Sequence, residues 1–420
     1  MIKNLCEEEL NMNSKLTIKT KTQKIHEKII VILMFFPSLY YSLANLYRGF
    51  TILYFLCFVC GAISYILLIR RAKAFLITIS LIIFSLLYAS LMNGHLFAYI
   101  FSSASLIEFS KSKLVLLIFI YLPTLVTCLS KKLDYGFILN RMFICSIIIL
   151  PLDIIIGVQR ITNGIYKIDY MTIAYEIFFW SMFCFFGMIE KKKVWPLILV
   201  IPSTTLIIVG GSRGALLCLT AVLLLLYCKR TFFVPHSKLK KGRIVVSYLL
   251  FLCAIIIALN ISDVINSVLN ILGNIGYSSR TLNSILSFSF LNNEDRISLQ
   301  AYLYPHLLDP VFGSGIYSDR FLVPTGQHAH NLFLELLIDF GLIAVPVILA
   351  IIWHTIKAIR ISIRLKNSYM QYLCIYSIVT IFGKFMFSAS YLESTEVFLA
   401  LGLLYNITTL KRQRSDEYES

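Results

Sequence analysis

Long apolar runs follow one another along most of the chain, and short polar segments separate them. A helix that crosses the hydrocarbon core of a bilayer needs about 20 apolar residues. The pattern therefore predicts an all-α polytopic membrane protein with about 12 transmembrane helices. The expected spans are residues 29–46, 50–69, 74–92, 114–129, 142–158, 170–189, 194–210, 214–228, 244–260, 332–353, 369–387 and 391–409.

One long segment interrupts this pattern. Residues 261–331 are far less apolar, and Asn, Ser, Gly and Pro cluster in them. A connection of this length is usually functional rather than a simple link. We expect short helices in it, around residues 263–272 and 294–307. The chain then divides into an N-terminal tail, nine spans, a large loop, three spans and a C-terminal tail, at residues 1–28, 29–260, 261–331, 332–409 and 410–420.

The composition agrees with a membrane protein. Hydrophobic residues make up 58% of the chain and charged residues only 14%, whereas an ordinary soluble domain has roughly 25% charged residues. The mean hydropathy is +0.80. These values exclude a soluble enzyme, a disordered chain and a secreted disulfide scaffold. Nine of the ten cysteines fall in or at the ends of apolar runs, so no disulfide framework is expected.

The positive charge indicates the orientation of the spans. The net charge is +16, which in a soluble protein would suggest a nucleic-acid partner. Here 28 of the 38 Lys and Arg residues lie in the loops on one side if the N-terminus is cytoplasmic. Positive residues in short loops stay in the cytoplasm. We therefore expect both termini in the cytoplasm, the large loop on the outer side of the membrane, and no nucleic-acid partner.

Two groups of arginines are candidates for binding anions on the outer face. Arg213 lies in Gly210-Gly211-Ser212-Arg213-Gly214, where two expected spans meet, and its guanidinium could grip a phosphate with two hydrogen bonds. The alternative is a tight turn with an arginine that reaches the interface. The large loop adds Arg280, Arg296 and Arg320, with Gly313-Ser314-Gly315 between the last two. Charged residues in loops are often only solvated.

A third group of polar residues precedes the tenth expected span. His328 and His330 lead into Asn331, Glu335 and Asp339, which are spaced by four and share one face of a helix. Histidine is well suited to move protons near neutral pH, and acids in a membrane helix tend to face a cavity or the bundle. The alternatives are an Asn helix cap with interfacial histidines, or a metal site completed by His306 or Glu335.

These residues resemble the motifs of the O-antigen polymerase and O-antigen ligase superfamily. Gly211-Ser212-Arg213-Gly214-Ala215-Leu216-Leu217 is similar to its arginine motif, and Glu294-Asp295-Arg296 is similar to a motif early in the long loop. His330-Asn331, followed by Gly341, is similar to a third. The order of the motifs and the topology also fit. The resemblance covers roughly residues 195–355, and the first half of the chain matches only in hydropathy.

The resemblance implies an inverting, metal-independent glycosyltransferase on the outer face of the inner membrane of a Gram-negative bacterium. The implied donor is an oligosaccharide on undecaprenyl pyrophosphate, and no cofactor is needed. Arg213 and Arg296 would neutralise the leaving pyrophosphate, and His330 would act as the base for the acceptor hydroxyl. Five more residues would bind the pyrophosphate or the glycan: Arg280, Arg320, His328, Asn331 and Glu335. A chain-length regulator is a further possible partner.

Several functions remain open. Gly341-Leu342-Ile343-Ala344 lacks the last glycine of the ligase pattern, which favours a polymerase over a ligase. A polymerase for capsule or another glycan is a third reading. A flippase or transporter of lipid-linked sugars belongs to a different class and would depend on Glu176 or Asp153 inside the spans. Lys384, Glu393 and Glu396 flank the turn between the last two spans, and a Lys–Glu pair there is expected to be structural rather than catalytic.

Overall fold

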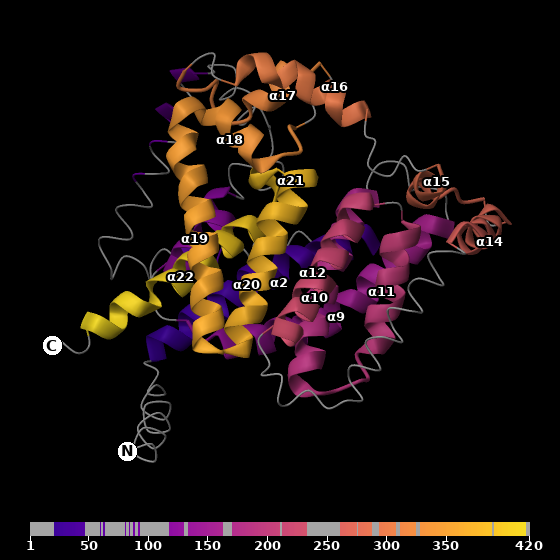
Figure 1. Cartoon of the computed structure of the whole chain (residues 1–420), viewed down its shortest axis with the longest axis horizontal. Coiled ribbons are helices and arrows are strands. Elements are labelled where there is room, and N and C mark those ends of the chain that lie inside the picture. The colour runs from indigo at the N-terminus through magenta and orange to yellow at the C-terminus, as the bar shows by residue number, and fades with distance from the viewer. Residues whose placement is uncertain are drawn as a thin grey trace.

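The computed structural model (Figure 1) shows a bundle of helices with several shorter helices packed on one end. It describes residues 21–46, 59, 62–63, 80, 84, 87–88, 91–92, 117–129, 133–162, 170–210, 212–232, 261–274, 276–287, 294–307, 311–324, 328–388 and 390–416. Within these ranges every regular element is a helix and there is no strand. This agrees with the all-α class expected from the apolar runs.

The helices follow the expected runs closely where the structure describes them. In chain order they are α2 (Lys21–Leu46), η1 (Leu117–Tyr121), α8 (Leu122–Leu129), α9 (Tyr135–Thr162), α10 (Tyr170–Lys191), α11 (Leu197–Val209), α12 (Arg213–Phe232), α14 (Ile261–Asn274), α15 (Arg280–Leu286), α16 (Glu294–Leu303), η3 (Tyr304–His306), α17 (Ser318–Leu322), α18 (Leu332–Phe340), η4 (Gly341–Ile343), α19 (Ala344–Leu365), α20 (Ser368–Val379), η5 (Thr380–Lys384), α21 (Phe385–Phe387), η6 (Tyr391–Glu393) and α22 (Thr395–Asp416).

Three of the described stretches are long and apolar enough to cross a membrane. They are Tyr135–Thr162, Met171–Lys191 and Leu332–Leu365, and the shorter apolar helices Leu197–Val209 and Arg213–Tyr227 also fall in expected spans. The number of twelve stays a prediction. The expected span at 244–260 lies outside the described residues, and so do most residues of the spans at 50–69 and 74–92.

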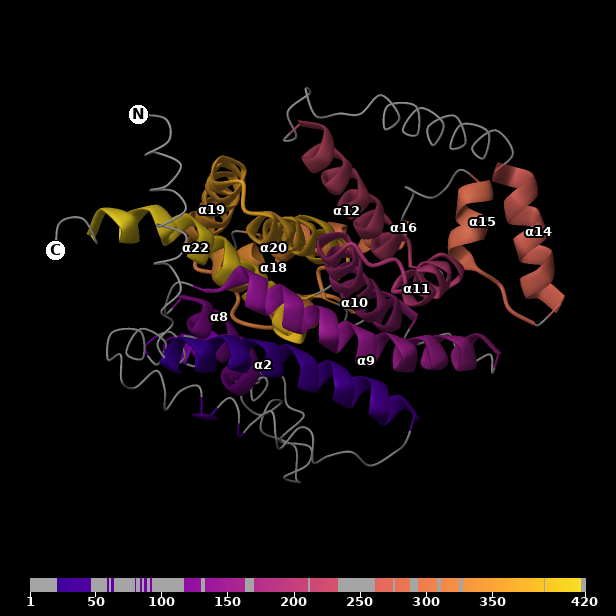
Figure 2. The same ribbon diagram turned by 90° about the horizontal axis from the view of Figure 1, so that it is seen from below.

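The centre of the bundle is an aromatic core along α10. Trp180, Phe183 and Phe186 are fully buried. The ring of Phe179 meets the edge of Trp180 at a centroid distance of 4.9 Å and the ring of Tyr376 from α20 at 5.8 Å. Helix α10 packs against α9 and α11, and α9 packs against α2. Figure 2 shows α2 and α9 running side by side along one edge of the bundle.

Helix α12 runs antiparallel to α20 and η5. The ammonium group of Lys229 lies 3.4 Å from the ring centroid of Tyr372. Cys218 lies eleven residues before Lys229 on α12, and Gly383 lies eleven residues after Tyr372. A Cβ added at Gly383 would lie 2.9 Å from the Sγ atom of Cys218, so these two residues also face each other. The two helices therefore keep one register over three turns. Helix α12 therefore begins toward the end of the bundle at which η5 and α21 end.

The helices expected in the large loop are present. Helix α14 covers the expected segment 263–272, while α16 and η3 together cover 294–306. Helices α14 and α15 lie beside α11, where the Tyr277 hydroxyl donates to the Val209 carbonyl at 3.1 Å. Helices α16, α17 and α18 gather at another place, on top of α19 in Figure 1. The loop therefore attaches to the bundle at two separate positions.

The tenth expected span is broken near its start. Helix α18 ends at Phe340, and its C-cap residue Gly341 has a φ of +55°, a backbone conformation that side chains with a Cβ rarely adopt. The backbone of residues 311–315 runs beside this break: Ser314 N donates to Ile338 O at 2.8 Å, and Leu342 N donates to Val311 O at 2.9 Å. A Cβ added at Gly313 would lie 2.5 Å from the Asp339 carbonyl oxygen. The break lets the loop backbone approach α18 directly, which a continuous helix would prevent.

Candidate active site

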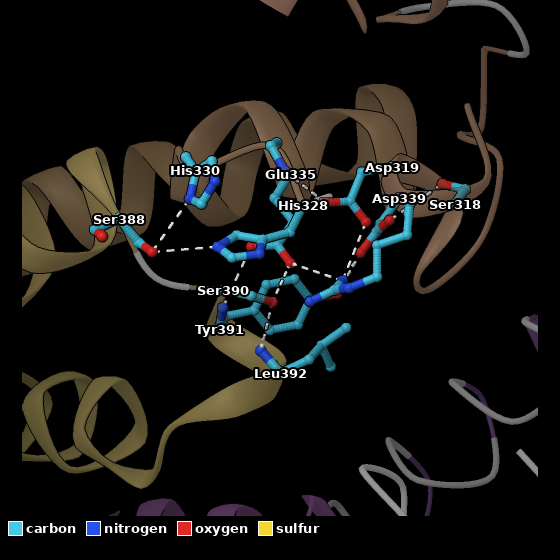
Figure 3. Close-up of polar contacts among 12 residues, drawn as sticks. Ser318, Asp319, His328, His330, Glu335, Asp339, Ser388, Ser390, Tyr391 and Leu392 are labelled. Atoms are coloured by element: carbon cyan, nitrogen blue, oxygen red, sulfur yellow. Dashed lines mark hydrogen bonds and ion pairs between the residues drawn. The ribbon is translucent and has the colours of Figure 1, made fainter. Parts of the chain in front are cut away.

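Two histidines meet on one backbone carbonyl at the top of the bundle. Nε2 of His328 and Nδ1 of His330 each lie 3.2 Å from the carbonyl oxygen of Ser388, which follows α21. The centroids of the two imidazole rings are 3.9 Å apart. Figure 3 shows both rings pointing at Ser388 from the segment that precedes α18. Residues about 60 positions apart in the sequence thus build one site.

This contact selects a tautomer for each ring. A carbonyl oxygen only accepts hydrogen bonds, so the ring nitrogen that faces it must carry the proton. For His330 the donor is Nδ1, and the basic lone pair of the neutral ring is then on Nε2. For His328 the donor is Nε2 and the lone pair is on Nδ1. A base whose other nitrogen is oriented by an acceptor is the usual arrangement for proton transfer.

The backbone at His330 is strained. Its φ is +54°, a left-handed conformation that costs about 1–3 kcal/mol for a residue with a Cβ. The next residue, Asn331, is the N-cap of α18, and its side-chain oxygen accepts from Phe333 N at 3.0 Å and Leu334 N at 3.1 Å. The helix cap therefore fixes the residue after His330, and this turn aims the imidazole back toward Ser388.

Helix α18 presents two fully buried acids to the same turn. Ser390 donates a short hydrogen bond to Oε1 of Glu335, and Tyr391 N donates to Oε2 at 3.3 Å. One turn further on, Asp339 accepts from the Tyr391 hydroxyl at 2.6 Å and from the Ser318 hydroxyl at 3.2 Å. The expectation that Glu335 and Asp339 share a face is confirmed, and that face looks at the turn after α21.

Arg320 is the cation of this acidic cluster. Its Nη1 lies 3.2 Å from Oδ1 of Asp319 and 3.7 Å from Oε1 of Glu335. The guanidinium also lies over the ring of Tyr317 at 4.8 Å. The other oxygen of Asp319 accepts from Ala329 N at 2.8 Å. Arg320 and Asp319 therefore tie α17 to α18 and to the histidine segment, so these contacts already use the guanidinium inside the protein.

Arg213 is the first residue of α12. Because α12 runs antiparallel to α20 and η5, this residue lies toward the end of the bundle where η5 and α21 lead to Ser388. Its side chain is partly exposed, and Ser212 N-terminal to it is buried, with its hydroxyl accepting from Ala215 N at 3.4 Å. The arginine motif and the histidine motif, which are more than 100 residues apart, thus come to one end of the bundle.

The two other predicted arginines stand on different helices. Arg296 is in the first turn of α16, and α16 is docked to α18 by a small apolar cluster that contains Leu299 and Ile338. Arg280 is the first residue of α15, which lies beside α11 and apart from α18 in Figures 1 and 2. The side chains of both arginines lie outside the described part of the structure, so their roles stay predictions.

Sequence reasoning missed several residues of this site. Ser388, Ser390 and Tyr391 were not expected to take part. Asp319 was noted only as the neighbour of Arg320 in the large loop, and Asp339 only as a neighbour on the helix face. The available signal was the pair Ser388 and Ser390, between the last two apolar runs. Among the residues that the structure describes, no group of three His, Cys, Asp or Glu side chains could hold a metal ion.

Comparisons with known proteins address the same region. Residues 197–349 match the family model described as O-antigen ligase. This match supports the assignment of the chain to the O-antigen polymerase and ligase superfamily. The matched segment contains every predicted site residue, from Arg213 on α12 to Glu335 on α18. The search of curated proteins and the search of solved structures found no match.

Proposed function

We propose that this chain is an O-antigen polymerase. It transfers the growing glycan from undecaprenyl pyrophosphate onto a new lipid-linked repeat unit, on the periplasmic face of the inner membrane of a Gram-negative bacterium. Members of the matched superfamily take part in polysaccharide assembly as glycosyltransferase-like enzymes. The proposal assigns the reaction to the end of the bundle that carries the histidines.

One observation carries the proposal. Nδ1 of His330 lies 3.2 Å from the Ser388 carbonyl oxygen, and α12 begins with Arg213 toward the same end of the bundle. Glycosyl transfer from a lipid pyrophosphate needs a base for the acceptor hydroxyl and cations for the leaving group. The two residue types that meet at this end of the bundle match these two needs.

The proposed step forms one bond and breaks one bond. Nε2 of His330 takes the proton of the acceptor hydroxyl, and the hydroxyl oxygen attacks the anomeric carbon of the donor sugar. The bond from that carbon to the pyrophosphate oxygen breaks, and the lipid pyrophosphate leaves with the electron pair. Attack opposite the leaving group inverts the anomeric centre. Arg213 and Arg296 stabilise the charge that develops on the leaving oxygens.

The remaining predicted residues take supporting parts in this proposal. Arg280 and His328 would contact the pyrophosphate or the glycan. Arg320, Asn331 and Glu335, whose side chains are engaged in the ion pair and in the helix cap, would shape the binding surface rather than grip the substrate. We further propose cytoplasmic termini and a chain-length regulator as a partner, and we propose no cofactor.

A ligase is the second candidate, because the matched family model carries that description. A ligase moves the finished polymer onto lipid A–core. Polymerase is preferred because Gly341 is followed by Leu342, Ile343 and Ala344, so the ligase pattern lacks its last glycine. Ala344 opens α19 and is 1% exposed, so the packing at this position suits a small side chain with a Cβ.

The test is a lipopolysaccharide gel from the host after deletion of this gene, with the wild-type gene returned on a plasmid as the control. Core carrying a single repeat unit, with no ladder, supports the polymerase. Bare core with polymer on the lipid carrier would mean a ligase. Bare core without periplasmic lipid-linked repeat units would mean a flippase, and an unchanged ladder would move the activity to capsule or another glycan.

A further inference from the structure

The turn after α21 is held to α18 by several buried hydrogen bonds that the proposed reaction does not use directly. Ser390 and Tyr391 both bind carboxyl groups of α18, at Glu335 and Asp339. The backbone of Leu392 donates to the Ser390 hydroxyl at 3.2 Å. The side chain of Leu392 is buried against Ile316 and Tyr317. We call Ser388, Ser390, Tyr391 and Leu392 the clasp turn.

A buried ion pair closes the base of the clasp turn. Nζ of Lys384 lies 2.7 Å from Oε1 of Glu396, and both side chains are buried. Ser388 N donates to the Lys384 carbonyl at 2.9 Å, and the Tyr376 hydroxyl donates to the Glu396 carbonyl at 2.9 Å. The structural pair expected from the sequence is therefore present. The pair joins Lys384, four residues before Ser388, to Glu396, four residues after Leu392, and so connects the two ends of the clasp turn.

The clasp turn carries a backbone atom that both histidines contact. That atom is the carbonyl oxygen of Ser388, and a backbone atom moves only when its segment moves. The segment is held above by the carboxyl groups of α18 and below by the Lys384–Glu396 pair. Because the N-cap residue of α18, Asn331, directly follows His330, the same contacts fix the carbonyl relative to the imidazole.

We infer that the clasp turn is a positioning element for His330, and that Ser390 and Tyr391 are its positioning residues. They act on the reaction through the Ser388 carbonyl, which holds Nδ1–H of His330 and so keeps the basic lone pair on Nε2. This inference rests on the proposed function, because it needs His330 to act as the base. The substrate does not have to touch Ser390 or Tyr391.

The test compares turnover by the purified full-length protein in nanodiscs. The substrate is the lipid-linked oligosaccharide extracted from the deletion host. Ser390→Ala removes the donor to Glu335, and Tyr391→Phe removes the donor to Asp339. We expect each variant to lower kcat by about 10-fold to 100-fold with KM unchanged, since small misplacements of a reacting group carry penalties of this size.

Matched controls separate positioning from general damage. Ser377→Ala removes an equally buried hydroxyl that donates to the Leu373 carbonyl of its own helix. Tyr88→Phe removes a phenol that donates to the Gly313 carbonyl at 3.2 Å, on the loop but not on the clasp turn. Both controls should keep kcat within about 2-fold of the wild type, as expected for groups that do not orient a reacting atom.

A double-mutant comparison decides whether the clasp turn acts through His330. In a His330→Asn background, Ser390→Ala and Tyr391→Phe should cause no further loss, because residues that act as a unit give non-additive losses. A further 10-fold loss in that background would overturn the inference. If the His330→Asn variant keeps full activity, His330 is not the catalytic base. That outcome contradicts the proposed function and is distinct from a failure of the positioning inference. Should Ser390→Ala not fold, Tyr391→Phe carries the same comparison.

Discussion

The aromatic core along α10 and the polar cluster around α18 are both buried, yet different forces hold their side chains. In the core, rings such as Phe179, Trp180 and Phe183 meet edge to face. Around α18, Glu335 and Asp339 are each fixed by hydrogen bonds from two directions. Ring packing controls volume and tolerates small rotations, whereas hydrogen bonds control direction.

The difference indicates what each part is for. Helices in a bilayer gain little from the hydrophobic effect, because lipid chains are as apolar as the core, so close packing holds them together. Burying carboxyl groups is costly and does not favour stability over apolar residues of the same size. The polar cluster therefore adds little to the stability of α18. Its hydrogen bonds instead fix the direction of the side chains and backbone that orient His330. Changes in the cluster should affect activity, and changes in the core should affect stability.

The largest effect on activity is expected at His330. His330→Asn keeps a residue that tolerates the left-handed backbone but removes the base, so turnover should fall by about 10²- to 10⁴-fold. Product formation from extracted lipid-linked oligosaccharide measures it, and thermal unfolding should stay near the wild type. His306→Asn, on the loop helix η3, is the control and should keep activity. If His330→Asn fails to fold, His330 contributes to stability in the same way as the aromatic core does, and the comparison fails at this residue.

Next in size is the loss of an arginine that neutralises the leaving group. Arg213→Ala and Arg296→Ala should each lower turnover by about 10²- to 10³-fold while the protein still inserts. Arg213→Lys should recover only part of the rate, because an ammonium cannot make the two-pronged contact of a guanidinium. Arg160→Ala, at the end of α9, serves as the control. Full activity in both alanine variants would remove these arginines from the site.

A middle effect, on both properties, is expected at Arg320. Arg320→Met removes the cation beside Asp319 and Glu335 and leaves buried carboxyl groups without their partner. Breaking a buried pair in this way costs about 3–5 kcal/mol of stability, and turnover should fall with it. Arg320→Lys should recover part of the stability. Thermal unfolding in detergent measures the change, and an unchanged melting temperature would mean that the ion pairs contribute little.

The smallest effect on activity is expected in the aromatic core. Phe179→Leu should lower the melting temperature through lost ring contacts, by less than the roughly 3–5 kcal/mol known for complete removal of a buried Phe side chain in soluble proteins. The turnover of the folded fraction should equal that of the wild type. A loss of kcat in the folded fraction would show that the aromatic core also orients the site, and the proposed division between core and polar cluster would then be wrong.

Much of the helical framework could be predicted from the chain because it depends on local pattern. Apolar runs mark helices such as α9 and α10, and spacing by four puts Glu335 and Asp339 on one face. The Asn331 cap was foreseen as an alternative to substrate binding, and the structure shows that cap. The position of His330 next to a carbonyl could not be predicted, because Ser388 lies 58 residues further along the chain.

The sequence by itself determined the all-helical class and the helices of the large loop, since these follow from composition and from periods within one helix. Only the tertiary structure decided that the run starting at Leu332 breaks at Gly341, because the backbone that fills the break comes from residues 311–315. It alone placed the start of α12 toward the same end of the bundle as the clasp turn, and it alone showed the hydrogen bonds from the clasp turn to α18. Contacts between distant segments depend on how helices pack, and no local pattern encodes that.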